Sequence, residues 1–177
     1  MSENSGSAGD RFWNFSLDRY RRPGVAEICL VMQDEAGVDV NLLLFCLWCG
    51  QEGVALEAED IAALDDAGPG AWREQVVRPL RAARRAMKEP PTAFEPSETE
   101  RLRTALKHVE IESERLQQMV LADTAEAMGL LEKADRSTLP DAAAAQANAT
   151  VYLAFLAGNP SGSQAGRLNE LIRLTID

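Results

Sequence analysis

The sequence predicts an all-α protein, and three observations lead to this prediction. Apolar residues recur at spacings of three and four from Phe12 to Leu174. Residues that start and stop helices bound these segments, and no segment shows the alternating pattern of a strand. The 177 residues, 46% of them apolar, are enough for one folded core. We expect a compact N-terminal helical unit, then a long heptad-patterned helix and C-terminal helices that form a bundle.

The first half of the chain contains short helices with clear boundaries. Asp10 is a plausible N-cap for a first helix, and Pro23 stands at the first position of a second one. Gly37 then provides a left-handed stop, and Asp39 is placed to cap a third helix over residues 40–49. That third helix is apolar nearly all round, so we expect it at the centre of the core.

Prolines set the helix boundaries in the next part of the chain. A short acidic helix is expected over residues 57–64, and Pro69 opens another helical segment. Pro79 falls inside that segment and predicts a kink near residues 76–78. Three prolines in residues 89–96 mark the clearest internal boundary.

The second half begins with a predicted capping box, Ser97 with Glu100. Apolar positions then alternate four- and three-residue spacings, which predicts a helix of about 30 residues with a heptad seam. The seam consists of Leu102, Leu106, Val109, Ser113, Leu116 and Val120. We expect Pro140 to begin an alanine-rich helix and Ser163 to cap the last helix.

The predicted organisation is a flexible tail (1–10) followed by a single helical domain (11–177). Within it, residues 11–89 form the N-terminal helical unit, 90–96 a proline-rich linker, and 97–177 the C-terminal part. The longest apolar run covers the ten residues 40–49, interrupted only by Asn41, and is about half as long as a membrane span needs. Three cysteines without a secretory signal predict free thiols in the cytoplasm.

Recognisable catalytic chemistry is sparse. Cys46 and Cys49 have the C-x-x-C spacing, but they lie at the C-terminal end of a predicted helix, where the dipole disfavours a thiolate. His108 has no partners at metal-ligand or dyad spacing, and we interpret it as a solvated side chain. We therefore predict no catalytic residue, no metal site and no cofactor.

A polar stretch between the two most apolar helices is more informative. In one interpretation its side chains are structural: Asp39 caps a helix, Asp34 pairs with an arginine, and Asn41 bonds a neighbouring backbone group. In the other, the stretch lines a small ligand pocket floored by two aromatic rings. The residues of this candidate pocket are Trp13, Tyr20, Gln33, Asp34, Asp39 and Asn41.

The same region carries a family resemblance. It includes the run 12–17 (FWNFSL), Tyr20, the run 23–25 (PGV), Gln33-Asp34, Gly37 and the run 39–48 (DVNLLLFCLW). These residues resemble the signature of a family of small uncharacterised bacterial proteins with a domain of unknown function. The resemblance is dense over residues 12–48 and looser through residues 72–81. It implies a bacterial cytosolic domain and no particular activity.

Charges are strongly segregated along the chain. The whole chain carries a net charge of −10, and residues 23–72 contain ten acids and no Lys or Arg. Residues 73–88 contain six bases and one acid, and they form an amphipathic basic helix. Such a helix either pairs with the chain's own acidic half or binds an anionic partner. The candidate partner-binding residues are Arg78, Arg81, Arg84, Arg85 and Lys88.

Three hypotheses for function follow. We favour a non-enzymatic helical interaction or adaptor protein that binds an unknown protein partner. The alternatives are a small-ligand or enzymatic site around Gln33, Asp34, Asp39 and Asn41, and a homodimer formed through the heptad seam. The acidic balance argues against nucleic-acid binding, because phosphates need neutralisation by Lys and Arg.

Overall fold

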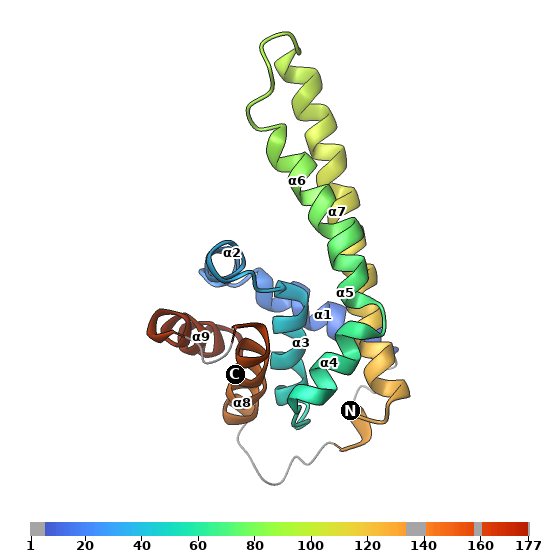
Figure 1. Ribbon diagram of the computed structural model, residues 1–177, viewed down its shortest axis with the longest axis vertical. Coiled ribbons are helices and arrows are strands. Elements are labelled where there is room, and N and C mark those ends of the chain that lie inside the picture. Colours follow the sequence, from blue (N-terminus) through green and yellow to red (C-terminus); the bar gives the residue numbers. More distant parts are fainter. Residues whose placement is uncertain (1–5, 134–140, 158–160, 177) are drawn as a thin grey trace.

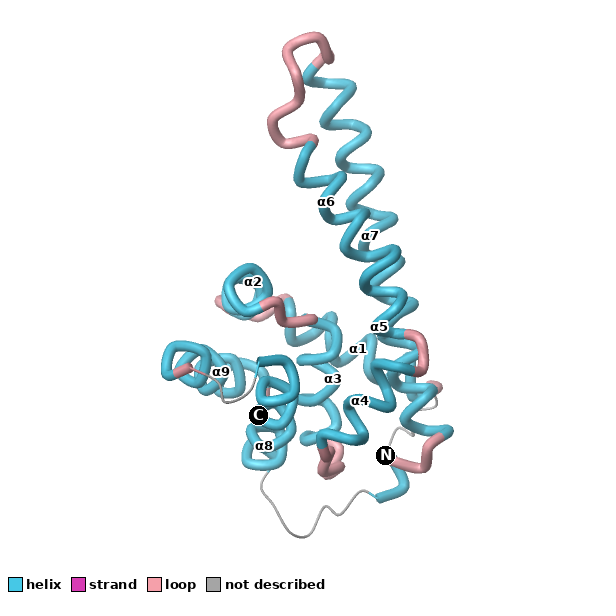
Figure 2. The backbone as a smooth tube through the Cα atoms, viewed as in Figure 1, coloured by secondary structure: helices cyan, strands magenta, loops and turns pink. Residues whose placement is uncertain are grey.

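The computed structural model describes residues 6–133, 141–157 and 161–176, and every regular element within these residues is helical (Figures 1 and 2). The predicted all-α class is therefore confirmed. The helices are α1 (Ala8–Tyr20), α2 (Val25–Ala36), α3 (Val40–Gln51), α4 (Ala58–Asp66), α5 (Pro69–Trp72), a π-helical turn (Arg73–Val77), α6 (Arg78–Ala86), α7 (Pro96–Ala127), a short 3-10 turn (Leu131–Lys133), α8 (Asp141–Ala157) and α9 (Gly162–Thr175).

Most predicted helix boundaries lie within a few residues of the observed ones. Asp39 caps α3 by accepting a hydrogen bond from the backbone N–H of Asn41, and Gly37 ends α2 with a φ of 66°. Asp10 is not the cap of α1, because the helix begins at Ala8 and Ser7 caps it. The first helix thus starts inside the segment predicted as a flexible tail. Pro140 lies outside the described residues.

Two other caps were predicted at the wrong residue. Helix α7 begins at Pro96, so Ser97 and Glu100 lie inside its first turns and form no capping box. Proline suits this first helical position because its φ is already helical and its missing N–H leaves no bond unmade. The last helix is capped by Ser161 rather than Ser163, with Gln164 completing the capping box.

Helices α5 and α6 form one continuous rod through the intervening π-helical turn. Pro79 lacks a backbone N–H and its ring crowds the carbonyl of Gln75, so a regular α-helix cannot pass this point undisturbed. The wider π turn lies immediately before Pro79 and accommodates that change. A kink was predicted near residues 76–78, and the structure has a π-helical turn over Arg73–Val77 at this place.

Helices α6 and α7 form a long hairpin that projects from the rest of the molecule (Figure 1). The proline-rich segment, residues 89–95, lies at its far tip. This segment was predicted to separate two halves of the domain. Instead, α7 returns along α6 and packs against α1 and α3, so the two halves share one core.

The core is built around α3, whose residues 41–50 are all buried. Phe12, Phe45 and Trp48 form an aromatic cluster with ring centroids 5.3–5.7 Å apart. Helix α8 packs most closely at Gly50, where an added Cβ would lie 2.3 Å from the backbone nitrogen of Ala145. The prediction of a central α3 follows directly from its apolar surface on all sides.

Polar side chains from α8 bond the two ends of α3. Asn148 accepts a hydrogen bond from the N–H of Leu56 and donates to the carbonyls of Cys46 and Val54. The hydroxyl of Tyr152 accepts a 2.8 Å hydrogen bond from the N–H of Asp39. Backbone groups beside α3 that would otherwise be buried without partners are therefore satisfied.

Four of the six seam residues of α7 are exposed to solvent. Leu102, Val109, Leu116 and Val120 are 45–54% exposed. The buried face of α7 carries mainly polar residues, namely Glu110, Ser113, Gln117 and Gln118, followed by Leu121, Ala122 and Ala125. Ion pairs and amide hydrogen bonds hold this polar face against the core.

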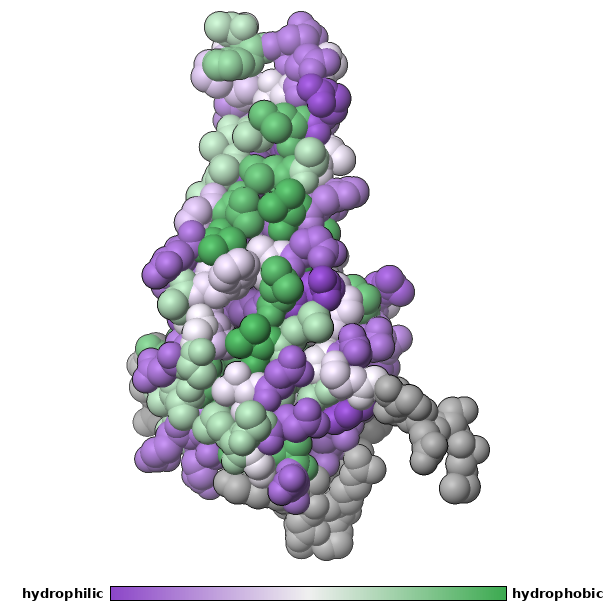
Figure 3. Space-filling model, turned by 90° about the vertical axis from the view of Figure 1, so that its right-hand side faces the viewer, coloured by the Kyte–Doolittle hydropathy of each residue, from purple (hydrophilic) through white to green (hydrophobic). Residues whose placement is uncertain are grey.

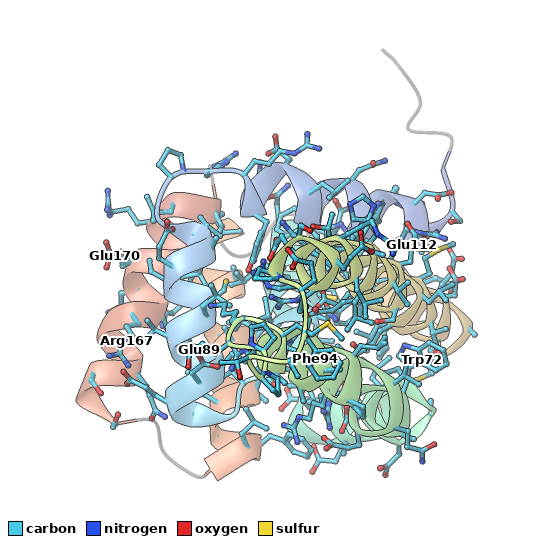
Figure 4. All side chains as sticks on the ribbon, turned by 90° about the horizontal axis from the view of Figure 1, so that it is seen from above. Trp72, Glu89, Phe94, Glu112, Arg167 and Glu170 are labelled. Carbon is cyan, nitrogen blue, oxygen red and sulfur yellow. The ribbon has the colours of Figure 1, made fainter. Side chains whose placement is uncertain are left out.

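Helix α2 lies between the hairpin and α9 when the molecule is viewed from above (Figure 4). On one side, Arg85 pairs with Asp34, and on the other, Arg167 pairs with Glu35. These charges place the last turn of α2 beside α6, and that placement creates the cavities described next.

Candidate ligand-binding site

The basic face of α6 is turned toward acidic and polar groups of the same chain. Arg81 donates hydrogen bonds to Gln33, Glu110 and Glu114. Arg84 pairs with Glu110, and Arg85 pairs with Asp34. Arg78 pairs with Glu74 on the exposed side of the helix. Lys88 is exposed and has no ion pair among the described residues.

These ion pairs alter the acidity of the two glutamates differently. Burial alone would raise the pKa of Glu110, but hydrogen bonds from Arg84 and Arg81 outweigh it and hold that pKa below its usual value. Burial raises the pKa of Glu114, and the single Arg81 contact does not fully offset the effect. A charged and a more readily protonated carboxyl therefore lie one helical turn apart on α7.

The larger cavity, called the groove below, has a volume of about 430 Å³ and lies between α1, α2 and α3 on one side and the hairpin on the other. Its walls are mostly apolar, with a polar inner end and charged residues at the hairpin. Its lining residues are Trp13, Ser16, Leu17, Tyr20, Ala26, Leu30, Gln33, Val40, Asn41, Leu44, Arg81, Arg84, Lys107, Glu110, Ile111, Glu114 and Gln118.

A smaller cavity of about 270 Å³, called the polar cavity below, lies between the α2–α3 connection and α6. Its lining residues are Gln33, Asp34, Gly37, Val38, Asp39, Arg73, Val77, Arg78, Arg81 and Arg85. Gln33 and Arg81 line both cavities and are hydrogen-bonded to each other. The two cavities are thus neighbours that share one polar wall.

The structure divides the predicted pocket residues between these cavities. Trp13, Tyr20, Gln33 and Asn41 line the groove. Asp34 and Asp39 line the polar cavity, where Arg78, Arg81 and Arg85 from the predicted basic face join them. Arg84 lines the groove, and Lys88 lines neither cavity. Two sets of residues proposed separately from the sequence therefore meet at one site.

A chain of hydrogen bonds links the cavities beneath their shared wall. Asp39 Oδ2 accepts from Arg73 at 3.1 Å and from Gln117 Nε2 at 2.6 Å. Asn41 Nδ2 donates to Gln117 Oε1 at 2.7 Å, and Gln118 Nε2 donates to Asn41 Oδ1 at 2.8 Å. Arg73 is held in turn by a two-pronged contact with Asp65, at 2.7 and 3.1 Å.

Two buried polar atoms at the groove have no hydrogen-bond partner among the described residues: the hydroxyl of Ser16 and Oε1 of Gln118. Each residue is only 3% exposed. Neither residue was among the predicted site residues. For Gln118 a signal was present, since two adjacent amides, Gln117 and Gln118, stand next to seam positions on a helix predicted to pack.

Burial suppresses ionisation of the aromatic hydroxyl and the thiols. It raises the pKa of Tyr20 to about 12, so the phenol that lines the groove stays neutral at physiological pH. It also raises the pKa values of Cys46 and Cys49, both of which are free and buried, as expected for structural thiols. Within the described part of the chain, no cluster of three or more His, Cys, Asp or Glu side chains is arranged to hold a metal ion.

The fold and the groove define a class of protein: an all-helical domain with an amphipathic cavity beside a projecting hairpin. The chain belongs to the family described as "Protein of unknown function (DUF2390)", whose model matches residues 11–121. This match includes every residue that lines the two cavities. No curated protein and no solved structure matches the chain. None of the helices in the described ranges combines the length and apolar content that a membrane span requires.

Proposed function

We propose that this protein binds a small amphipathic ligand in the groove, as a binding protein rather than an enzyme. The observation that carries the proposal is a pair of buried, unpartnered polar atoms, Ser16 Oγ and Gln118 Oε1, which belong to two residues that line one cavity. Leaving a buried polar group without a partner costs about 1–3 kcal/mol. A ligand that satisfies both atoms removes that cost, and the apolar walls add burial of its remaining surface.

The charge arrangement supports this function over a partner held by the basic face. Arg81, Arg84 and Arg85 already have acidic partners within the chain. An external anionic protein or nucleic acid has to displace those partners before it pairs with these side chains. We therefore assign Arg81, Arg84 and Arg85 to the lining of the two cavities rather than to a partner-binding surface.

The test is to fill the groove without disturbing the fold. Ile111 is 39% exposed and lines the groove, so Ile111→Trp reduces its volume. Leu116→Trp provides the matched control, because Leu116 is 45% exposed on the same helix and does not line the groove. A fragment library of neutral, cationic and anionic compounds is screened against all three proteins by ligand-observed NMR.

We expect fragments that bind the wild type to lose binding to Ile111→Trp and to keep it with Leu116→Trp. Binding that is equal in the two variants, or an absence of binding to the wild type, contradicts the proposal.

A second candidate function is a helical interaction or adaptor protein that acts through the exposed seam. Apolar side chains gather along the face of the hairpin that Figure 3 shows. Four exposed apolar residues belong to the heptad pattern of α7: Leu102, Val109, Leu116 and Val120. Contiguous exposed apolar surface is typical of protein–protein contacts. The partner in this proposal is a second copy of the chain or another helical protein, and not a nucleic acid.

The proposed compartment is the bacterial cytoplasm. All three cysteines are free and buried, which is typical of proteins in a reducing environment. The family resemblance of residues 12–48 supports the same assignment.

A further inference from the structure

We infer that the ligand enters the groove with an uncharged hydrogen-bond donor, a hydroxyl or a primary amide, directed at Gln118. This inference rests on the proposed function of the groove. It follows from the direction of the hydrogen-bond chain that ends there, which runs through Asp39, Gln117, Asn41 and Gln118.

The direction is set at Asp39. A carboxylate only accepts hydrogen bonds, and that of Asp39 forms an ion pair with Arg73, 3.1 Å away. Gln117 therefore presents its NH₂ group to Asp39, over a distance of 2.6 Å. This contact fixes which end of the Gln117 amide is nitrogen and which is oxygen.

The orientation then passes from one amide to the next. Gln117 Oε1 faces Asn41, so Asn41 must donate from Nδ2 and keep Oδ1 on its other side. Gln118 must in turn donate from Nε2 to that oxygen, which leaves Oε1 as the free end of the chain. The carboxylate of Asp39 at one end of the chain thus makes Gln118 at the other end a hydrogen-bond acceptor. The ligand group that complements Gln118 is therefore a hydrogen-bond donor.

The charge of the ligand's inner end follows from its surroundings. A carboxylate would place negative charge against the lone pairs of Gln118 Oε1. An ammonium would lose its hydration among neutral acceptors, and the two carboxylates that line the groove, Glu110 and Glu114, are already paired with Arg81 and Arg84. A neutral donor meets neither difficulty. Ser16 both donates and accepts, so it also accommodates the carbonyl of an amide.

The oxygen of Gln118 is itself buried, so the neighbouring side chains at the inner end of the groove must shift for the ligand to reach it. The apolar part of the ligand then lies against Trp13, Leu17 and Ile111. An eight-carbon chain with a small polar head matches this combination of apolar walls and polar end.

The experiment compares four probes that differ only in the head group: octanamide, the isosteric methyl ketone, octanoate and octylamine. Binding to the full chain is measured by isothermal titration calorimetry. We expect octanamide to bind roughly tenfold or more tightly than the ketone, because the ketone has no donor for a buried acceptor. Octanoate and octylamine are expected to bind more weakly than octanamide.

Two variants test the origin of the preference. In Gln118→Met the acceptor is gone and the side-chain volume is nearly kept, so the octanamide preference is lost while the ketone binds as before. In Asp39→Asn the residue can donate to Gln117, and the whole amide chain can reverse and present Gln118 Nε2 to the groove. The octanamide preference is then lost as well. Gln75→Met, at an exposed glutamine, is the matched control and keeps the preference.

Circular dichroism first shows that the variants are folded, and each binding result then supports or contradicts a specific proposal. If all four probes bind the wild type equally well, or octanoate binds best, the donor inference is wrong and the groove remains a ligand site. If none of them binds, and the fragment screen also finds nothing, both proposals fail. If Gln118→Met retains the full preference, the donor is recognised elsewhere and the inference is overturned.

Discussion

At the scale of single residues, Asp39 has the greatest number of separate roles. It caps α3 through Oδ1, pairs with Arg73 and Gln117 through Oδ2, and bonds Tyr152 through its backbone. Helix caps are usually exposed and interchangeable, but this one is 8% exposed and joins four elements. The buried amides next to it depend on it for their orientation.

Asn41→Leu is expected to destabilise the protein by about 1–3 kcal/mol. Asn41 is 6% exposed, and its removal leaves Gln117 Oε1 and Gln118 Nε2 buried without partners. The free energy of unfolding is measured by urea titration. Asn14→Leu on the exposed side of α1 is the control, and its effect is expected within about 0.5 kcal/mol of zero. Equal effects of the two substitutions contradict the hydrogen-bond account.

The sequence predicted these residues only in part. The capping role of Asp39 follows from residue type and position alone, as does the burial of Asn41 among leucines. One of the two interpretations grouped Trp13, Tyr20, Gln33 and Asn41, which line the groove, with Asp34 and Asp39, which line the polar cavity instead. Ser16 and Gln118 were not found, because the amide that fixes Gln118 lies 77 residues away in the chain. Local patterns carry no information about such a pairing.

At the scale of helices, the small residue Gly50 sets the distance between α3 and α8. Gly50 lies in the last turn of α3 directly against the backbone of Ala145. A glycine in a helix is usually destabilising relative to alanine. Here it permits the close approach that allows Asn148 and Tyr152 to reach the two ends of α3.

Gly50→Ala is therefore expected to destabilise the protein by about 3 kcal/mol or more, because its methyl group overlaps backbone atoms that cannot turn aside. Gly166→Ala on α9 is the opposite case, since among the described residues no atom beyond the adjacent backbone of its own helix lies within 4 Å of the added carbon. That substitution is expected to stabilise the protein by about 0.5–1 kcal/mol. Both effects are read from thermal and urea unfolding. A mild effect at Gly50 would show that α8 packs less closely than described.

The hairpin marks where helix-level prediction succeeded and where it failed. The existence and length of α7 follow from its heptad spacing, and the irregularity before Pro79 follows from the chemistry of proline. The buried face of α7 does not follow, because the pattern places apolar residues inside. Glu110 is buried instead, since Arg81 and Arg84 from α6 neutralise it, and those arginines are 26–29 residues away in the sequence.

At the scale of the whole molecule, the hairpin projects from the other helices (Figure 1), and four residues of its seam are exposed to solvent: Leu102, Val109, Leu116 and Val120. We expect the chain to form dimers at micromolar concentration through this surface. Light scattering after size-exclusion chromatography should give a mass near twice 19.3 kDa. The double variant Val109→Glu, Leu116→Glu places two negative charges on the exposed seam. These charges should prevent dimer formation, and the measured mass should fall to that of one chain.

The control for this prediction adds the same charge elsewhere on the hairpin. Ala82→Glu combined with Ala86→Glu changes two exposed positions of α6, and this variant should keep the wild-type mass. A wild-type chain that remains monomeric at all concentrations contradicts self-association. In that case the seam remains available only to a different partner.

The packing of α8 on α3 also has a consequence for the newly made chain. Helix α3 has almost no polar face, yet Asn148, which bonds its C-terminal end, lies 102 residues after Cys46. At a synthesis rate of about 5–20 residues per second, the ribosome needs roughly 5–20 s to make that intervening segment. During this interval an apolar helix has emerged without its main neighbour. The nascent chain is therefore most open to aggregation, and most dependent on chaperones, between the synthesis of α3 and that of α8.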